Sequence, residues 1–261
     1  MKFKSKALVA ALALVATGAA NAAITGYNDE GPGSIMLSVW DKTNNVSALF
    51  DLGIDTDGFA PAAALTGMSW DLTAGDYADA WGSFSAGMDM ANTVFMVFGG
   101  DITTATYGGQ YFVSTATNAS SVAAMTNADI QKFNTTDGFV EASDSAGNHS
   151  TADNGANVAS SGTAFQGSAG SMQDTWGGAS TFVATSELGS SLSFFAMQGV
   201  DGGRGANGLP VVVSEYAGSF VLGSDGQLSY AVAAVPEPES YALMLAGLGL
   251  IGAVARRRAG R

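Results

Sequence analysis

The middle of the chain consists of short apolar runs that turn-forming residues separate. Each run is five to seven residues long and rich in β-branched and aromatic side chains, as in Thr93-Val-Phe-Met-Val-Phe and Gln110-Tyr-Phe-Val-Ser-Thr. Such runs are typical of strands, and a continuous apolar run is typical of a strand buried on both faces. About eight or nine of them predict an all-β fold, for which an antiparallel β-sandwich with one or two short helices is the most economical architecture.

Two of the connections between strands have the residues that hairpin turns require. Residues 34–40 and 46–52 are apolar runs joined by a polar stretch around Asn44-Asn45, and Asn tolerates a positive φ better than most residues. Near the end of the body, Gly223-Ser-Asp-Gly separates two alternating runs in the same way. Both stretches therefore predict antiparallel hairpins.

One segment has the period of a helix instead. Tyr77, Trp81 and Phe84 recur at i, i+4 and i+7 behind Asp76, which has the residue type of a helix N-cap. The pattern predicts a short amphipathic helix whose aromatic stripe packs on the sheet, in preference to an aromatic platform for a ligand. A weaker helical pattern covers residues 120–133.

Residues 135–180 have a different composition from the rest of the body. They are dominated by Gly, Ser, Ala, Thr, Asn and Asp, with few large apolar side chains. Such a stretch buries little apolar surface to offset the entropy lost on ordering. We therefore expect a low-complexity excursion over the surface or a partly disordered insert.

The amino terminus has the three parts of a secretory leader. Lysines at positions 2, 4 and 6 precede an apolar run from Ala7 to Ala16, and Ala20-Asn-Ala follows as an A-x-A cleavage site. The run is short of the ~20 residues that a membrane-spanning helix needs. We expect residues 1–22 to be a signal peptide that is cleaved between Ala22 and Ala23, so that the body is exported.

The charge of the body is strongly negative. Of the 23 acidic residues, two lie in the tail and 21 lie from Asp29 to Asp225, against only Lys42, Lys132 and Arg204. A surface of this sign repels phosphate backbones, so nucleic acid is excluded as a partner. Because the chain has no cysteine, the body must be held together by its apolar core without disulfides. Residues 23–234 are expected to form one exported acidic domain.

The tail combines a stiff acidic turn, an apolar run and a basic end. Pro236-Glu237-Pro238 has two fixed φ angles around a carboxylate, Tyr241 to Ala255 are uncharged, and Arg256, Arg257 and Arg258 follow. As a helix, the uncharged run is short for a hydrocarbon core of ~30 Å, although the arginines can extend it by snorkelling. Their position predicts a membrane stop with the body on the non-cytoplasmic side.

The order and spacing of these tail features resemble a known sorting signal. Val235-Pro-Glu-Pro, the following apolar run with Gly247-Leu-Gly-Leu, and the terminal arginines are similar to the PEP-CTERM signal of exported proteins in Gram-negative bacteria. The resemblance covers about residues 235–258 and makes 235–261 a sorting and anchor segment. It implies that a membrane-embedded exosortase cuts at or near Pro236-Glu237-Pro238, and it implies a link to exopolysaccharide and biofilm formation.

Residues for catalysis or for transition metals are scarce in this chain. The single histidine, His149, lies in a polar stretch that reads as a solvated loop, and without cysteine no zinc, copper or iron site is expected. The neighbouring carboxylates Asp55 with Asp57 and Asp76 with Asp79 could serve a glycosidase, but nothing in the sequence singles out either pair.

One short stretch resembles the opening of a calcium loop. Asp55-Thr-Asp57-Gly supplies alternate carboxylates and a glycine, but Phe59 and Thr66 occupy the later ligand positions of an EF-hand, so that motif fails. A looser Ca²⁺ site at Asp55 and Asp57 is the one cofactor candidate; no other cofactor is expected.

The sequence therefore predicts an exported protein without enzymatic activity. We expect it in the periplasm, the outer envelope or the extracellular matrix after transient anchoring in the inner membrane, with an exosortase-like enzyme, the membrane and extracellular polysaccharide as partners. The alternatives are a secreted hydrolase acting on polysaccharide and a structural protein that self-assembles at the cell surface.

Overall fold

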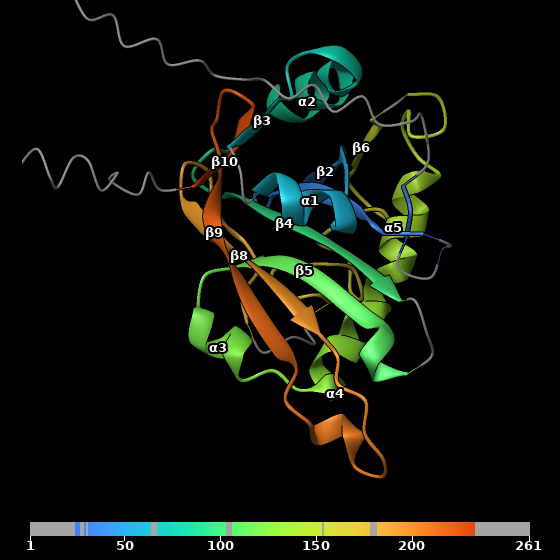
Figure 1. The fold of residues 1–261 in the computed structure, drawn as a ribbon. Helices are drawn as coiled ribbons and strands as arrows, with labels where there is room; N and C mark the ends of the chain where they lie inside the picture. The colour runs from blue at the N-terminus through green and yellow to red at the C-terminus, as the bar shows by residue number, and fades with distance from the viewer. Residues whose placement is uncertain are drawn as a thin grey trace, which may run out of the picture.

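A computed structural model of the protein describes residues 24–26, 29, 31–63, 67–102, 106–152, 154–177 and 182–232, apart from the side chains of 60–63 and 135. The described part is mostly β-structure with a few short helices (Figure 1). The strands are β1 (Ser34–Asp41), β2 (Val46–Asp55), β3 (Met68–Asp71), β4 (Thr93–Ile102), β5 (Gln110–Ala116), β6 (Ala156–Ala159), β7 (Ser186–Glu187), β8 (Ser191–Gln198), β9 (Val212–Leu222) and β10 (Gln227–Val232). The helices are α1 (Thr56–Ala63), η1 (Gly75–Tyr77), α2 (Ala78–Ser85), η2 (Tyr107–Gly109), α3 (Ala119–Ala123), α4 (Asn127–Ile130), η3 (Gln131–Thr136), α5 (Asp137–Asp144) and η4 (Ala206–Gly208).

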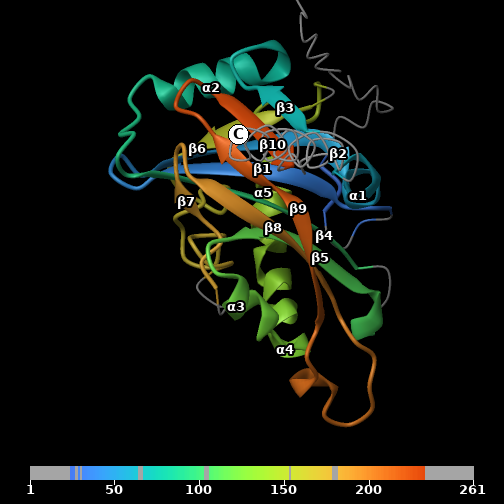
Figure 2. The same ribbon diagram turned by 60° about the vertical axis from the view of Figure 1, so that its left-hand side comes forward.

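All the described strands belong to one antiparallel sheet. Its order is β3-β10-β9-β8-β5-β4-β1-β2-β6, with β7 paired to β4. The predicted antiparallel β-fold with short helices is thus confirmed, but the expected pair of packed sheets is replaced by one continuous curled sheet (Figure 2). A sheet of about ten strands twists and curls, so it can enclose a core without a second sheet.

The curl brings the two ends of the sheet toward each other. Trp70 on β3, at one end, donates its indole N–H to the carbonyl oxygen of Leu52 on β2, near the other end, at 2.8 Å. We call the face enclosed by this curl the first face. Phe59 of α1 lies at its centre, with ring centroids 5.0 Å from Phe194 and 5.2 Å from Tyr230. The first-face core contains Ile35, Leu37, Val39, Phe50, Leu52, Phe59, Leu72, Tyr77, Trp81, Phe84, Phe95, Val97, Val113, Leu192, Phe194, Phe220, Leu222, Leu228 and Tyr230.

Both predicted hairpins are confirmed. The antiparallel pair β1–β2 surrounds Asn45, whose φ is +53°, and β9 and β10 pair on either side of the turn at 223–226. The aromatic stripe of Tyr77, Trp81 and Phe84 is buried against the first face, as predicted. The N-cap assignment was wrong: Asp76 lies inside η1, and α2 follows Tyr77 without a side-chain cap.

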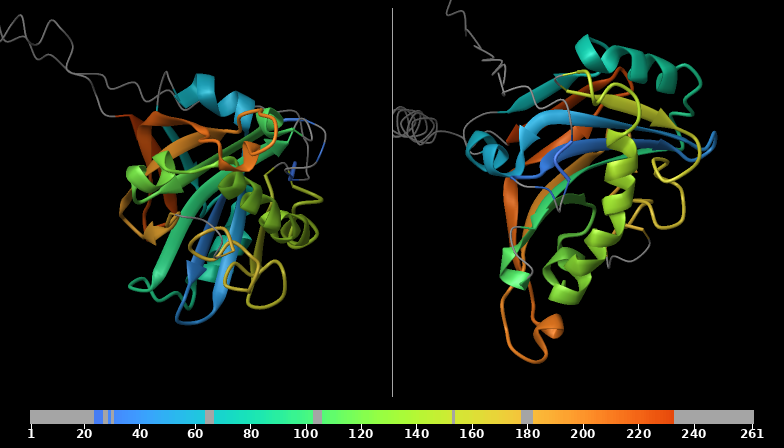
Figure 3. Two further views of the ribbon diagram at one scale, coloured as in Figure 1. Left: turned by 90° about the horizontal axis from the view of Figure 1, so that it is seen from below. Right: turned by 90° about the vertical axis from the view of Figure 1, so that its right-hand side faces the viewer.

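The opposite face of the sheet, here the second face, is covered by residues from the centre of the chain. In Figure 3, α5 and the coil around it lie against the side of the sheet opposite to α2. Phe133 stacks on Phe112 of β5 with centroids 4.5 Å apart, and the Trp176 ring lies 3.9 Å from Phe133. The second-face core contains Ile24, Met36, Leu49, Met96, Phe98, Phe112, Val122, Met125, Ile130, Phe133, Phe139, Val140, Met172, Trp176, Phe182, Phe195, Met197 and Val211.

Residues 135–180 are therefore not a surface excursion over the part that the structure describes. They form the end of η3, helix α5, strand β6 and a coil, and they supply Phe139, Val140, Met172 and Trp176, each at most 1% exposed. Burying a large apolar side chain contributes about 1.5–3 kcal/mol, so a few well-placed anchors can order a segment of small residues.

Other boundaries also differ from the sequence pattern. The expected helix over residues 120–133 is broken into α3, α4 and η3, and β9 runs without a break from Val212 to Leu222. In the ranges that the structure describes, no helix is long and apolar enough to cross a membrane, and the run Tyr241 to Ala255 lies outside those ranges.

Candidate functional site

Two hollows lie next to each other at one end of the sheet. They flank η2, which joins the end of β4 to β5, and they are completed by the end of β8 and the loop that carries η4. Their volumes are about 660 Å³ and 360 Å³. Since loops at the end of a rigid sheet commonly carry binding residues, this end is the candidate site.

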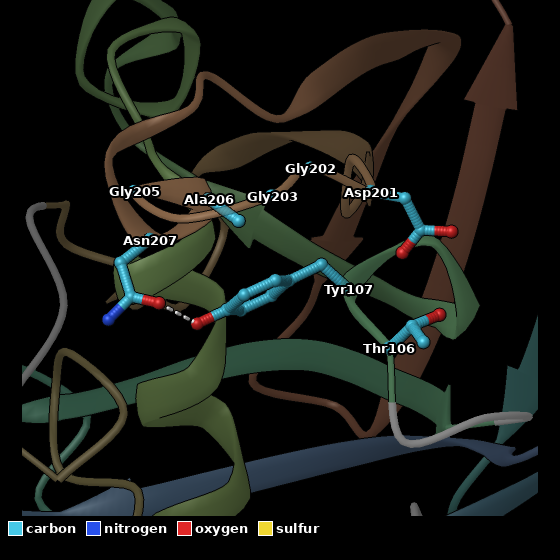
Figure 4. Close-up of a pocket in the computed structure, with 8 residues that line it drawn as sticks. All are labelled: Thr106, Tyr107, Asp201, Gly202, Gly203, Gly205, Ala206 and Asn207. Carbon is cyan, nitrogen blue, oxygen red and sulfur yellow. Dashed lines mark hydrogen bonds between the residues drawn. The ribbon is translucent and has the colours of Figure 1, made fainter.

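The larger hollow has one aromatic wall and a polar, glycine-rich wall (Figure 4). The phenol O–H of Tyr107 donates to the side-chain oxygen of Asn207, which fixes the ring across the hollow. Asp201 accepts the backbone N–H of Gly108 at 2.8 Å and so ties the loop to η2. Gly205 has a φ of +96°, which only glycine adopts without strain, and this lets the loop turn back into η4.

The smaller hollow is lined by two carboxylates and a phenol. Asp57 comes from the first turn of α1, Asp101 from the end of β4, and Tyr111 from β5. Burial, followed by the charge of Asp57, raises the pKa of the Asp101 carboxyl. Tyr111 shares a hydrogen bond of 3.0 Å with Tyr216, and Gln198 donates to the carbonyl oxygen of Gly108 at 2.6 Å.

The structure separates the two residues of the predicted calcium candidate. Asp55 ends β2, where its carboxylate accepts the N–H of Gly58 and caps the start of α1, while Asp57 lines the smaller hollow. In the part of the chain that the structure describes, no three acidic or histidine side chains gather in a group that could hold a metal. Calcium binding stays an untested prediction.

The other sequence candidates are placed as follows. Asp76 and Asp79 are exposed on η1 and α2 and do not line either hollow at this end. His149 is 0% exposed, so its assignment to a solvated loop was wrong. The ring packs against Gly155, where a Cβ would come within 2.4 Å of Nδ1, and burial lowers the pKa of the imidazole.

The predicted processing residues lie outside the described residues. These are Ala22 and Ala23 at the leader, the motif 236–238, and the arginines 256–258. The hollows, in contrast, were missed by the sequence, because Tyr107 and Asn207 are one hundred positions apart. The only local signal was Asp101, which comes two glycines after the apolar run 93–98 and before a connection that contains Gly108 and Gly109.

Comparison with known proteins gives one match. The family model described as the PEP-CTERM protein-sorting motif matches residues 234–258. No match was found among curated proteins or among solved structures. The matched range contains the Pro-Glu-Pro motif, the apolar run and the arginines, and it confirms the resemblance in the tail. The tail therefore carries a PEP-CTERM sorting motif, a kind of signal that exosortase processes and that indicates export to the cell envelope or beyond.

Proposed function

We propose that the protein is a non-catalytic component of the cell envelope or extracellular matrix whose acidic body binds polysaccharide after sorting. The observation that carries this proposal is the sorting motif at residues 234–258. The remainder of the chain supplies what an exported binding module needs: an ordered β-domain without cysteine and a net negative body. Its charge favours neutral or cationic polymers over nucleic acid.

The larger hollow supports polysaccharide as the ligand. The flat face of Tyr107 can stack on the apolar face of a sugar ring, and Asn207 and Asp201 supply amide and carboxylate groups for its hydroxyls. The hydrogen bond from Tyr107 to Asn207 holds the ring in place before a ligand arrives, which lowers the entropy lost on binding.

A polysaccharide hydrolase is the second candidate, and the smaller hollow favours it. Asp57 and Asp101 share this hollow, and the pKa of Asp101 is raised by burial and by its neighbour. A carboxyl group with a raised pKa beside a second carboxylate is the arrangement that a glycosidase uses for its acid. We favour binding over hydrolysis because the body is rich in acidic residues, so two neighbouring carboxyl groups are weak evidence for a catalytic pair.

The sorting half of the proposal is tested by mass spectrometry of the exported protein. We expect a mature form that begins at Ala23 and has lost the residues after the Pro-Glu-Pro motif. Replacing residues 236–238 by alanine should retain the uncut tail in the membrane fraction, whereas Glu239→Ala, just outside the motif, should be processed normally. An extracellular form that keeps both the uncut motif and Arg258 would contradict the proposal.

The binding half is tested with a panel of soluble polysaccharides and the sorted protein. We expect binding without turnover, and Tyr107→Ala should weaken it about tenfold, equivalent to roughly 1.4 kcal/mol. Asp101→Asn is the matched variant in the other hollow and should leave binding unchanged. Chain shortening that Asp101→Asn abolishes would establish the hydrolase instead.

A further inference from the structure

The segment 145–152 joins the covers of the two faces at the edge of the sheet that β6 forms. Asn148 donates its side-chain N–H to the carbonyl oxygen of Asp76 in η1 at 2.9 Å. Its Oδ1 accepts the N–H of Ala156 at 2.7 Å, and its own backbone N–H donates to the carbonyl oxygen of Ala156 at 3.2 Å. The segment therefore ties the first-face cover to the last strand of the sheet.

The next side chain, His149, points into the protein. It is 0% exposed, and its Nε2 lies 3.2 Å from Oδ1 of Asn157 on β6. Because an amide oxygen only accepts hydrogen bonds, Nε2 carries the proton of the neutral ring. Nδ1 has no hydrogen-bond partner among the described residues, and a Cβ at Gly155 would come within 2.4 Å of it. The enclosure therefore fits a neutral imidazole and has no acceptor for a second N–H.

The groups around the ring do not favour its charged form enough to offset its burial. Burial lowers the pKa of His149, although the hydrogen bond with Asn157 and the charge of Asp144, the last residue of α5, both act in the opposite direction. The charge of Asp144 also adds to the burial that raises the pKa of Asp51 on β2 to about 6. From β6, the ring meets the amide of Asn157 and the bare backbone of Gly155, neither of which is charged.

We propose that segment 145–152 is an acid-opened flap, which closes over the neutral imidazole of His149 and opens when the imidazole takes up a proton. In the closed form an imidazolium has a buried N–H without an acceptor, whereas in the open form water solvates both N–H groups. The closed form is therefore fully favoured above the ordinary pKa of 6.5 and loses stability as the pH falls below that value.

Opening of the flap alters a third hollow, here the edge hollow, which lies between α2 and β6 and has a volume of about 300 Å³. Gly147 and Asn148 line it from the flap, and Asp79 and Ser83 line it from α2. The open flap also loses the hydrogen bond from Asn148 to η1. Acid therefore widens this edge of the sheet and leaves the pairing of β9 with β10 in place.

Hydrogen exchange of the exported full chain between pH 7.5 and pH 5, corrected for the intrinsic exchange rate, tests the flap. The N–H groups of Thr151, Ala152 and Ala156 report on it, because all three bind oxygens of Asn148. We expect their protection to fall about tenfold over this range, and that of Gly223 in the β9–β10 turn to change by less than about twofold. An equal loss of protection at Gly223 would mean that acid unfolds the whole domain and would overturn the proposal.

Three variants separate the imidazole from the other titrating groups. Asn157→Asp places a carboxylate opposite Nε2, where it pairs with the imidazolium, and should remove the acid dependence. Asn118→Asp adds the same charge at the exposed cap of α3 and should leave the dependence unchanged. Asp51→Asn removes a carboxyl that titrates in this range with the opposite sign, so protection should fall at least as steeply as in the parent. Acid opening that persists in Asn157→Asp, or vanishes in Asn118→Asp, would contradict the proposal.

The imidazole can also be followed without a substitution, because His149 is the single histidine of the chain. We expect an NMR titration of its ring to have a midpoint below the ordinary 6.5 and to coincide with the loss of protection at Ala152. A midpoint at 6.5 or above with protection unchanged would show that the closed flap accommodates the charged ring, and the proposal would fail. None of these measurements depends on polysaccharide binding or on sorting.

Discussion

Both faces of the sheet are buried, but they differ in the side chains that they present and in the segments that cover them. The first face has a large apolar core and is covered by α1, α2 and the curled end of the sheet. The second face mixes apolar side chains with the buried polar residues Ser38, Ser47, Asp51 and Gln110, and its cover is largely coil. A cover of helices and strands pairs its own backbone N–H and C=O groups, so it needs only apolar contacts with the sheet. A cover of coil leaves some of these backbone groups to find partners on the sheet.

The polar residues of the second face provide those partners. Ser47 accepts the backbone N–H of Gln166 at 2.9 Å, and Ser38 donates to the Gln166 side chain at 2.6 Å. The same side chain donates to the carbonyl oxygen of Gln173 at 2.8 Å. A segment rich in glycine and serine is thus ordered by a few buried apolar anchors and by hydrogen bonds to the sheet.

The strongest test of this comparison removes one aromatic anchor from each face. Trp176 is 0% exposed on the second face and Trp81 is 4% exposed on the first. If both covers are integral to the domain, each replacement by alanine should lower the free energy of unfolding by about 3–5 kcal/mol, measured by urea denaturation.

Hydrogen exchange localises the two effects. Trp176→Ala should increase exchange in α5 and η3, and Trp81→Ala should increase it in α2, while the pairing of β9 with β10 stays protected in both. A loss below 1 kcal/mol for Trp176→Ala would show that the second cover contributes little and would restore the surface-excursion interpretation.

The contrast also explains what the sequence could predict. Strand runs, both hairpin turns and the stripe of Tyr77, Trp81 and Phe84 were recognisable because each is encoded within about twelve neighbouring residues. The burial of Trp176 and His149 was not, since it depends on partners such as Phe133 and Asn157 that composition does not identify. One sheet rather than two likewise follows from the non-local pairing of β5 with β8, which joins the strands on either side of it into one sheet.

The tail and the candidate site also differ in whether their residues are close together in the sequence. The sorting motif is contiguous, so residues 235–258 were sufficient to recognise it. The hollows depend on the ends of β4, β5 and β8 and on the η4 loop, which are brought together only by the folded sheet. Tyr107 and Asn207 therefore had no signal in the sequence.

A second test asks whether a buried carboxyl on the second face lowers stability at neutral pH. Burial raises the pKa of Asp51 to about 6 from an ordinary value of 3.8. The native state therefore holds a proton that the unfolded state has lost between these pH values, so the contribution of Asp51 to stability falls from pH 4 to pH 6 and is constant above. Asp51→Asn should remove this dependence and raise the free energy of unfolding at pH 7 by about 2–3 kcal/mol.

The comparison must be made as a difference between variant and parent at each pH, because the body has many other acids. Asp79→Asn, an exposed change on the first-face cover, is the matched control and should follow the parent within about 0.5 kcal/mol. Parallel pH curves for Asp51→Asn and the parent would show that Asp51 is ionised normally in the folded domain.

The smallest expected effect concerns the side-chain amide of Gln166, which links the coil of the second cover to Ser38 on the sheet. Gln166→Leu keeps a similar volume but leaves the Ser38 hydroxyl and the Gln173 carbonyl oxygen without their partner. A buried polar group left unpaired costs about 1–3 kcal/mol, and that loss should appear in the free energy of unfolding. Gln131→Leu, on the exposed side of η3, should change it by less than about 0.5 kcal/mol. Adding Ser38→Ala to Gln166→Leu should recover part of the loss, because it removes one stranded hydroxyl. If Gln166→Leu were as stable as the parent, apolar anchors alone would hold the second cover, and the polar residues of that face would be incidental to its order.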